Sequence, residues 1–312
     1  MTDHLRRDLQ ASLGISDYLL NRLFQRAPHS YKVYTIPKRS GGQRTIAQPA
    51  KETKFIQRWL IQNIFSQLPV HECASAYKVG ASIKKNANAH KKNSYVTKLD
   101  FKDFFPSIKS DDLVKHISKH LGSSLGAQDI QDIARISCIR LLGRSDLCLS
   151  VGAPSSPVLS NTIMYGFDSE VSAWCAESGI TYTRYADDLT FSTSTKGISS
   201  DIEPFVKGIA QKLTYPSLSL NNKKTTHLSK KHQRRITGII INNEGNLSLG
   251  RNRKREISAL IHKYSLGMLP EPEMFRLQGL LGFAKDVEPL FVARMRGKYT
   301  SRLIDEIFQK RK

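Results

Sequence analysis

The sequence of 312 residues is poor in cysteine: it has four, and no two of them have the Cys-x-x-Cys spacing of a zinc site. We therefore expect reduced, mostly buried thiols, as in cytoplasmic proteins. The sequence also lacks an apolar run long enough to cross a bilayer, and its first residues lack the apolar centre of a signal peptide. These absences predict a cytoplasmic protein with no disulfide framework, no zinc site and no membrane span.

Acidic residues are scarce beside basic ones. The chain has 27 Asp and Glu against 48 Lys and Arg, which gives a formal net charge of +21. Such an excess predicts a polyanionic partner, either a nucleic acid or an anionic membrane surface. With 39% hydrophobic residues, the chain can still bury a full core and a second, smaller one.

Basic residues gather in five clusters. One such cluster alone is usually a solvated face. Because all five flank the motifs between residues 99 and 225, we expect them to follow a phosphate backbone without reading its sequence, with a steep dependence of binding on salt. The clusters are Lys84-Lys85, Lys91-Lys92, Lys230-Lys231, Arg234-Arg235 and residues 251–255.

Two adjacent carboxylates, Asp187 and Asp188, stand between β-type runs at 180–185 and 189–193. Like charges this close raise each other's pKa unless a cation neutralises them. The pair therefore indicates a metal site. Aspartates are also common in turns because they form local hydrogen bonds, so the pair alone is a weak signal.

A third carboxylate, Asp100, comes directly after a predicted strand at 94–99. A strand-end Asp and a hairpin-turn Asp pair can meet across a sheet. Three carboxylates around two Mg²⁺ ions about 3.5–4 Å apart form the clamp used for nucleotidyl transfer. One ion would activate the primer hydroxyl, and the other would hold the triphosphate and stabilise the leaving pyrophosphate. The alternative is that Asp100 only ends its strand and caps the segment after it.

The spacing of apolar residues predicts a mixture of helices and strands with no repeat, low-complexity tract or obvious linker. We therefore expect one interleaved architecture instead of two separate domains. Predicted helices cover two segments within 2–27, then 53–68, a segment from Ser110 to Gly122, 127–142, a run from a Ser156 N-cap through Trp174, and the basic last seventy residues with a stripe at Ile257, Leu260, Ile261 and Tyr264. Predicted strands include a hairpin of Tyr31–Pro37 with Gln43–Ala47, and a strand over Arg235–Asn242.

Four motifs follow one another along the chain: Leu99-Asp100-Phe101-Lys102-Asp103-Phe104-Phe105, Gly152-Ala153-Pro154-Ser155-Ser156-Pro157, Tyr185-Ala186-Asp187-Asp188 and Asn222-Lys223-Lys224-Thr225. As an ordered series over about residues 30–250 they resemble the successive motifs of reverse transcriptases. Bacterial members, and retron reverse transcriptases in particular, are the most similar. Two further elements resemble retron ones: Asn86-Ala87-Asn88-Ala89-His90 fits Asn-Ala-x-x-His, and Ile236-Thr237-Gly238 fits Val-Thr-Gly with Ile in place of Val.

The resemblance implies an α+β fold of the right-hand polymerase type. Fingers would cover residues 1–95, a palm with an antiparallel sheet residues 96–240, and a basic helical thumb residues 241–312. Further fingers helices would be inserted near 112–150. Asp100, Asp187 and Asp188 would be the catalytic carboxylates and would bind two Mg²⁺ ions, with Asp100 and Asp187 as the main ligands.

The resemblance also implies a deoxynucleotide site. Phe105 falls where the family keeps an aromatic ring that would clash with a ribose 2′-OH, and the alternative is a core residue beside Phe104. Phe101 and Asp103 belong to the same motif. Gly152 and Ala153 open a helix against the substrate. The residue before that glycine is usually Gln, and Val151 in its place cannot hydrogen-bond a sugar or template.

Cations are expected at the triphosphate. Arg44 in the hairpin aligns with the residue that grips it, helped by Lys38 or Arg39, because the planar Arg fork suits phosphate. Solvated hairpin charges are the alternative. Lys224 resembles the lysine that would protonate pyrophosphate, and the sequence does not choose between it and Lys223.

Candidate RNA contacts lie outside the acidic motifs. Asn86 could read a base edge and His90 could stack on a base, or both could be structural. The family implies that Thr237 and Gly238 help to recognise an RNA hairpin, although a strand with a bulge explains them equally well. The other expected contacts are Tyr185, Arg234, Arg235, Arg251, Arg253, Lys254 and Arg255.

The resemblance implies an RNA-directed DNA polymerase that binds a structured noncoding RNA and copies it from an internal guanosine 2′-OH into branched RNA-linked DNA. Partners would be dNTPs, the RNA–DNA hybrid and an effector protein of an antiphage system. Two alternatives stay open. One is another bacterial reverse transcriptase of the intron-related, diversity-generating or abortive-infection type. The other is a non-catalytic RNA-binding scaffold, which Val151 supports and the complete aspartate set opposes, because buried carboxylates without a metal are destabilising.

Overall fold

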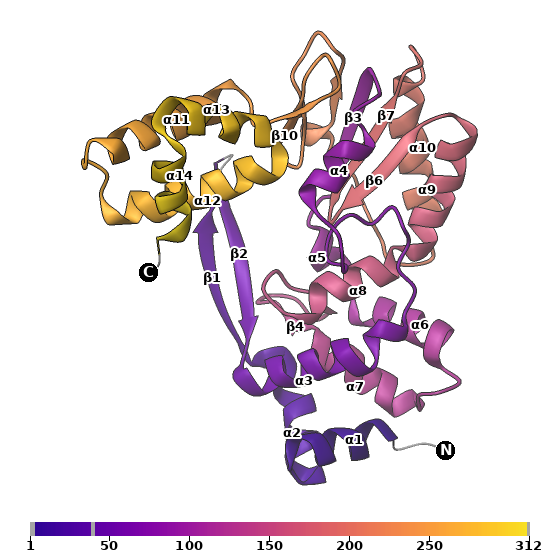
Figure 1. Cartoon of the computed structure of the whole chain (residues 1–312). Coiled ribbons are helices and arrows are strands. Elements are labelled where there is room, and N and C mark those ends of the chain that lie inside the picture. Colours follow the sequence, from indigo (N-terminus) through magenta and orange to yellow (C-terminus); the bar gives the residue numbers. More distant parts are fainter. Residues whose placement is uncertain (1–3, 39–40, 311–312) are drawn as a thin grey trace. The chain divides into compact units, whose positions relative to one another are not determined.

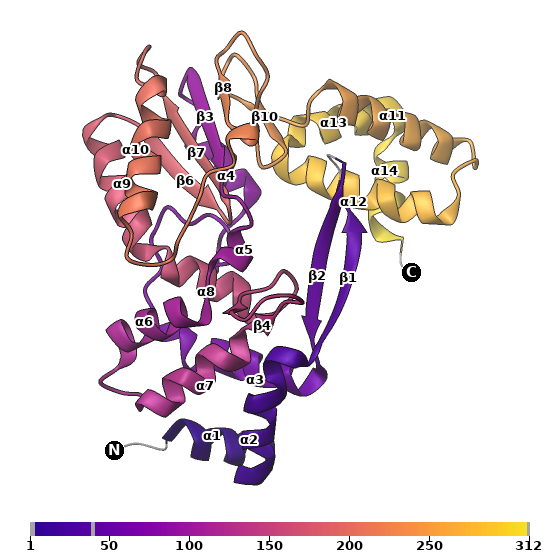
Figure 2. The ribbon, with the colours of Figure 1, turned by 180° about the vertical axis from the view of Figure 1, so that it is seen from behind.

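The computed structural model describes residues 4–38 and 41–310 (Figures 1 and 2). The chain forms two compact units. The first comprises Met1–Gly80, Lys98–Leu189 and Ser200–Thr226, and the second comprises Ala81–Thr97, Thr190–Ser199 and His227–Lys312. The chain passes from one unit to the other inside strands β3 (Tyr95–Asp100), β7 (Asp188–Thr193) and β8 (Thr226–Leu228). This interleaving agrees with a sequence that has no obvious linker.

The first unit begins with helices α1 (His4–Leu13) and α2 (Asp17–Arg26), as predicted. The short helix η1 (Ala27–His29) leads into a two-stranded ribbon, β1 (Tyr31–Pro37) and β2 (Gln43–Pro49), visible in Figure 1. The strands pair antiparallel from Tyr31 opposite Pro49 to Pro37 opposite Gln43, which confirms the predicted hairpin. Helices α3 (Lys51–Asn63) and η2 (Phe65–Gln67) come next, where one helix was predicted.

A four-stranded sheet has the order β6-β7-β3-β8, in which β6 is Thr181–Tyr185. Helices α9 (Tyr165–Glu177) and α10 (Ser199–Lys212) lie beside it in both views (Figures 1 and 2). The short helix α5 (Phe104–Ser107) and then α6 (Ser110–Leu121) come after β3, and η3 (Asn222–Lys224) precedes β8. The Phe101 amide donates to the Asp187 carbonyl, so the end of β3 lies beside the start of the neighbouring strand β7.

Two predicted helices have different bounds. Helix α7 (Ala127–Ser137) stops at Cys138, whose backbone is extended, and the chain enters β4 (Ile139–Arg140), which pairs with β5 (Leu147–Cys148). The prediction of a helix to 142 was therefore wrong at its end. The apolar stripe through Trp174 is split between α8 (Ser155–Ile163) and α9. Pro154 is the N-cap residue, so the Ser156 cap was wrong; the Ser156 hydroxyl accepts a hydrogen bond from the Ser150 amide instead.

The second unit combines α4 (Ile83–Ala89), a three-stranded antiparallel sheet and four helices. The sheet contains β9 (Arg234–Ile236), β10 (Ile239–Ile241) and β11 (Leu247–Ser248). The single strand predicted over Arg235–Asn242 was wrong. Thr237 and Gly238 have φ values of +45° and +86° and form a two-residue hairpin turn. The helices are α11 (Arg251–Ser265), α12 (Glu271–Val287), α13 (Pro289–Tyr299) and α14 (Ser301–Gln309).

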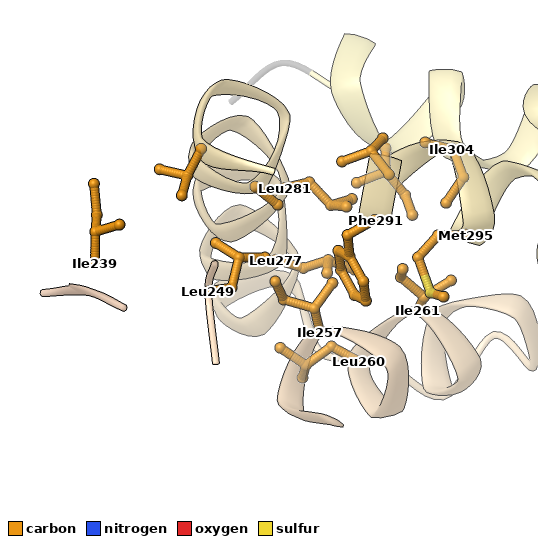
Figure 3. Close-up of a cluster of buried hydrophobic side chains, with 14 of the residues drawn as sticks. Ile239, Leu249, Ile257, Leu260, Ile261, Leu277, Leu281, Phe291, Met295 and Ile304 are labelled. Atoms are coloured by element: carbon orange, nitrogen blue, oxygen red, sulfur yellow. The ribbon is translucent and has the colours of Figure 1, made fainter. Parts of the chain in front are cut away.

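The core of the second unit confirms the predicted helical stripe. Ile257, Leu260 and Ile261 of α11 are buried among residues of α12, α13 and α14, including Leu277 and Phe291 (Figure 3). Ala87 of α4 and Val96 of β3 belong to the same cluster. The second unit therefore needs residues from the 81–97 segment as well as from residues 227–312 to complete its core.

The four cysteines are free and buried, as predicted. Over residues 4–38 and 41–310, no helix is both long and apolar enough to cross a membrane.

Candidate active site

Three carboxylates lie where the two central strands of the four-stranded sheet, β3 and β7, meet at one end. We call Asp100, Asp187 and Asp188 together the acidic edge. Asp100 ends β3, Asp187 is in the turn after β6, and Asp188 begins β7. Two backbone hydrogen bonds fix these ends: the Phe101 amide donates to the Asp187 carbonyl over 3.1 Å, and the Asn221 amide donates to the Asp100 carbonyl over 2.7 Å. The fold therefore gathers the acidic residues that the sequence singled out.

The acidic groups repel one another. Burial raises the pKa of Asp187, and the Asp100 carboxylate raises it further. Burial also raises the pKa of Asp188, against the opposing effect of Lys98, whose Nζ lies 3.2 Å from Oδ2 of Asp188. Asp100 is paired with Lys224, whose Nζ donates to Oδ1 over 2.8 Å and to Oδ2 over 2.9 Å. Both lysines reduce a negative charge that a metal ion would also reduce.

The donor chemistry fits a hard divalent cation, because carboxylate oxygens are the ligands that Mg²⁺ prefers. The lysine amines are the cations that contact these carboxylates here. Within the described part of the chain, no three acidic, histidine or cysteine side chains are arranged around a common metal position.

Sequence reasoning missed Lys98 and Arg184. Lys98 lies two residues before Asp100 in β3, and side chains two apart in a strand share a face. That spacing was a usable signal for a cation beside the acidic edge. Arg184 is completely buried one residue before Tyr185. A charged residue within the β-type run before the aspartates was the signal that could have revealed it, since buried charges need partners.

The loop at Val151 and Gly152 packs against strand β2 of the hairpin. Gly152 has φ +120°, and a Cβ built on it would lie 2.9 Å from the Ala47 carbonyl oxygen. The Ala47 amide donates to the Val151 carbonyl over 2.8 Å, so this loop holds β2 through its backbone. Position 152 needs glycine because its φ is positive and because the Ala47 carbonyl of β2 leaves no room for a Cβ. Ala153 is buried behind it.

The predicted hairpin cations and motif aromatics occupy different environments. Arg44 and Lys38 are exposed, and Arg39 lies outside the described residues. Phe101 is 1% exposed and packs on Phe104 and Phe167, so its side chain belongs to the core, contrary to its predicted contact with substrate. Asp103 is exposed, and Phe105 is half-buried with its ring 5.5 Å from that of Phe104.

Comparison with known proteins identifies the family. Residues 36–241 match the family described as reverse transcriptase (RNA-dependent DNA polymerase). The chain belongs to the reverse transcriptase family. It is similar to the retron Ec83 reverse transcriptase of Escherichia coli, with 38% identity over 314 residues that cover 98% of each chain. It is also similar to the retron Ec73 reverse transcriptase of Escherichia coli, with 33% identity over 285 residues and 88% of each chain.

The protein is thus a retron-type reverse transcriptase, an RNA-directed DNA polymerase with the α+β fold of the right-hand polymerases. Of its predicted RNA contacts, Asn86 and His90 are buried in the second unit. His90 Nδ1 lies 2.7 Å from the Ser192 hydroxyl oxygen, and burial lowers the pKa of His90 to about 3. These side chains cannot stack on or read a base from this position, so the structural interpretation of both residues is favoured.

Arg234 also differs from the prediction. It is 1% exposed, and its guanidinium donates to the backbone carbonyls of Asn93 and Asn242. Arg234 therefore holds two segments of the reverse transcriptase together and does not present its charge to RNA. Its neighbour Arg235 is exposed.

The other predicted RNA contacts remain accessible to different degrees. Arg251, Lys254 and Arg255 line a hollow at the start of α11, and Lys254 is paired there with Glu288 over 2.6 Å. Arg253 lies 5.0 Å from the ring of Phe283. In the hairpin turn, Gly238 is exposed and the Thr237 hydroxyl donates to the Ile83 carbonyl over 3.2 Å. Tyr185 is half-buried, with its ring 6.5 Å from that of Tyr77.

Proposed function

We propose that this reverse transcriptase copies a structured noncoding RNA and begins the DNA strand at the 2′-OH of an internal guanosine, which yields branched RNA-linked DNA (msDNA). The observation that carries the chemistry is the meeting of Asp100, Asp187 and Asp188 at one sheet edge. These residues would hold two Mg²⁺ ions, which when bound activate the attacking hydroxyl and stabilise charge on the phosphates.

The chain's own groups have separate parts in this proposal. Lys224 stays next to Asp100 and can give a proton to the leaving pyrophosphate. Arg44, with Lys38 nearby on the hairpin, binds the triphosphate. Phe105 rests on Phe104 and excludes a ribose 2′-OH, which makes dNTPs the substrate. In the same proposal, the fingers are residues 1–95, the palm 96–240 and the thumb 241–312.

RNA binding is proposed for the exposed basic groups of the second unit. Arg235, the Thr237–Gly238 turn and the hollow at Arg251 and Arg255 offer positive charge and backbone groups to a phosphate chain. We also propose that the RNA–DNA product and an effector protein assemble in an antiphage system. The retron relatives favour the retron type over the other bacterial reverse transcriptases.

The test combines the purified enzyme, its copurifying RNA, Mg²⁺ and dNTPs. We expect DNA that stays joined to RNA through a 2′–5′ bond, so that a debranching enzyme shortens the product. An Asp187→Asn, Asp188→Asn double variant should lose at least about 10³-fold in rate, because it removes the carboxylates that would hold the Mg²⁺ ions. Asp201→Asn in α10 is the matched control. Undiminished synthesis by the double variant would refute the catalytic assignment, and DNA started only from RNA 3′ ends would refute the priming proposal.

A further inference from the structure

Arg184 forms a buried ion pair directly beneath the turn that carries Asp187. Its side chain and that of Asp168 in α9 are both 0% exposed. Arg184 Nε donates to Oδ1 of Asp168 over 2.9 Å, and Nη2 donates to Oδ2 over 2.6 Å. A fork of this kind fixes the plane of the guanidinium as well as its position.

The remaining nitrogen of the guanidinium reaches the turn itself. Arg184 Nη1 donates to the Ala186 carbonyl over 3.2 Å and to Oδ1 of Asn161 in α8 over 3.1 Å. Ala186 has φ +58°, a conformation that alanine rarely adopts unless its surroundings impose it. Because Ala186 immediately precedes Asp187, the direction of its carbonyl helps to set where the catalytic carboxylates lie.

The residues around this ion pair form further hydrogen bonds of their own. The Tyr182 hydroxyl donates to Oδ1 of Asp168 over 2.9 Å, and Nδ2 of the Asn161 side chain donates to the Ala76 carbonyl over 2.8 Å. The backbone of Arg184 is held as well, since its carbonyl accepts from the Ser75 amide over 2.8 Å. The guanidinium is therefore bonded directly to α8, to α9 and to the turn, and through Asn161 it is linked to Ala76.

We infer that Arg184 and Asp168 are positioning residues for nucleotidyl transfer: they hold the Ala186 carbonyl, and through it Asp187 and Asp188, without touching the substrate. A contribution to stability alone does not account for the arrangement, because apolar residues often replace a buried ion pair at no cost. An apolar replacement cannot, however, donate a hydrogen bond to the turn. The inference rests on the proposed catalytic role of Asp187 and Asp188.

Two variants test the inference by primer extension with Mg²⁺. Arg184→Lys keeps a charge for Asp168 but cannot serve the fork and the Ala186 carbonyl together. The triple variant Arg184→Met, Asp168→Leu, Tyr182→Phe replaces the pair with apolar groups. We expect kcat to fall about tenfold in the first and about 100-fold in the second, since small misplacements of reacting groups cost this much. KM for dNTP and Kd for template–primer should change less than about threefold.

The matched control is the pair of Arg6 and Asp132, which joins α1 to α7. An Arg6→Met, Asp132→Leu variant should leave kcat within about twofold, because that pair does not reach the turn. Thermal unfolding identifies which variants fold, and Arg184→Lys decides the outcome if the triple variant does not. A folded Arg184→Lys enzyme with kcat within about twofold of the parent overturns the inference. The Asp187→Asn, Asp188→Asn variant in the same assay separates the two questions: if it stays active, the proposed catalytic site fails instead.

Discussion

The amine of Lys224 sits between the two carboxylate oxygens of Asp100, 2.8 Å from one and 2.9 Å from the other. The lysine belongs to η3 and the aspartate to β3, and the Asn221 amide bonded to the Asp100 carbonyl keeps the two elements together. The sequence offered Lys223 and Lys224 equally. The fold brings Lys224 to the acidic edge.

Replacing Lys224 with Ala should lower kcat by about 100-fold, which is the usual contribution of a proton donor in the transition state. Lys223→Ala should change kcat less than about twofold, because Lys223 is exposed beside it. Single-turnover rates of nucleotide addition measure both. A larger loss for Lys223→Ala would show that the wrong lysine has been assigned.

Gly152→Ala should damage the enzyme, because the added Cβ would lie 2.9 Å from the Ala47 carbonyl oxygen and φ is +120°. We expect a stability loss of about 1–3 kcal/mol, the usual cost of such strain. Gly166→Ala in α9 is the matched control: nothing lies within 4 Å of its added Cβ, so helix propensity should stabilise it by up to about 1 kcal/mol. Chemical denaturation compares the two, and equal stabilities would contradict the packing described for Gly152.

Arg234 and Arg235 are adjacent in β9 but should fail in different ways. Arg234→Ala removes the guanidinium that donates to the carbonyls of Asn93 and Asn242 and leaves its buried space unfilled, so it should destabilise the fold by about 2–3 kcal/mol. Arg235→Ala should keep stability and weaken RNA binding, with the slope of log K against log salt reduced by about 1. Filter binding at several salt concentrations tests this, and an unchanged slope would remove Arg235 from the RNA contacts.

Acid should destabilise the protein through two buried histidines. Burial lowers the pKa of His90 and of His116 to about 3. An unfolded histidine titrates near pH 6.5, so between pH 6.5 and about 3 the unfolded chain binds protons that the folded chain does not. Above pH 6.5 these histidines do not lower the free energy of unfolding. At pH 5 each of them should lower it by about 2 kcal/mol.

A His116→Phe variant separates this effect from general acid denaturation. His116 Nε2 has no hydrogen-bond partner within the part of the chain that the structure describes, so the change to Phe should be tolerated at pH 7. Urea denaturation measures the free energy of unfolding at pH 7 and at pH 5. The variant should show about half of the decrease that the two histidines together cause between these pH values. An identical pH dependence in parent and variant would contradict the assignment.

Much of the architecture follows from local chemistry that a sequence displays. The two helices within residues 2–27, the β1–β2 hairpin and the α11 stripe at Ile257, Leu260 and Ile261 depend on neighbours in sequence, and all three were predicted correctly. The proximity of Asp100, Asp187 and Asp188 was predictable for a different reason, because nucleotidyl transfer, the chemistry proposed for them, needs those residue types.

Features that the sequence could not show depend on long-range contacts. Asn86 and His90 were predicted as RNA contacts because they stand between two lysine pairs, and Arg234 because it belongs to a basic cluster. They are buried because Ser192 and the carbonyls of Asn93 and Asn242 supply partners from distant segments. Likewise, Thr237 gave no clear sign of a turn, since φ values above zero are rare for a β-branched residue.

The passage of the chain between units inside β3, β7 and β8 limits how such enzymes can be recombined. A graft of residues 227–312 from a relative would leave behind Ala87 and Val96, which fill the core those helices surround. A working chimaera must therefore exchange 81–97 and 190–199 as well, and so cut the two strands that carry Asp100 and Asp188. Any exchange of this unit between lineages consequently disturbs the strands of the acidic edge.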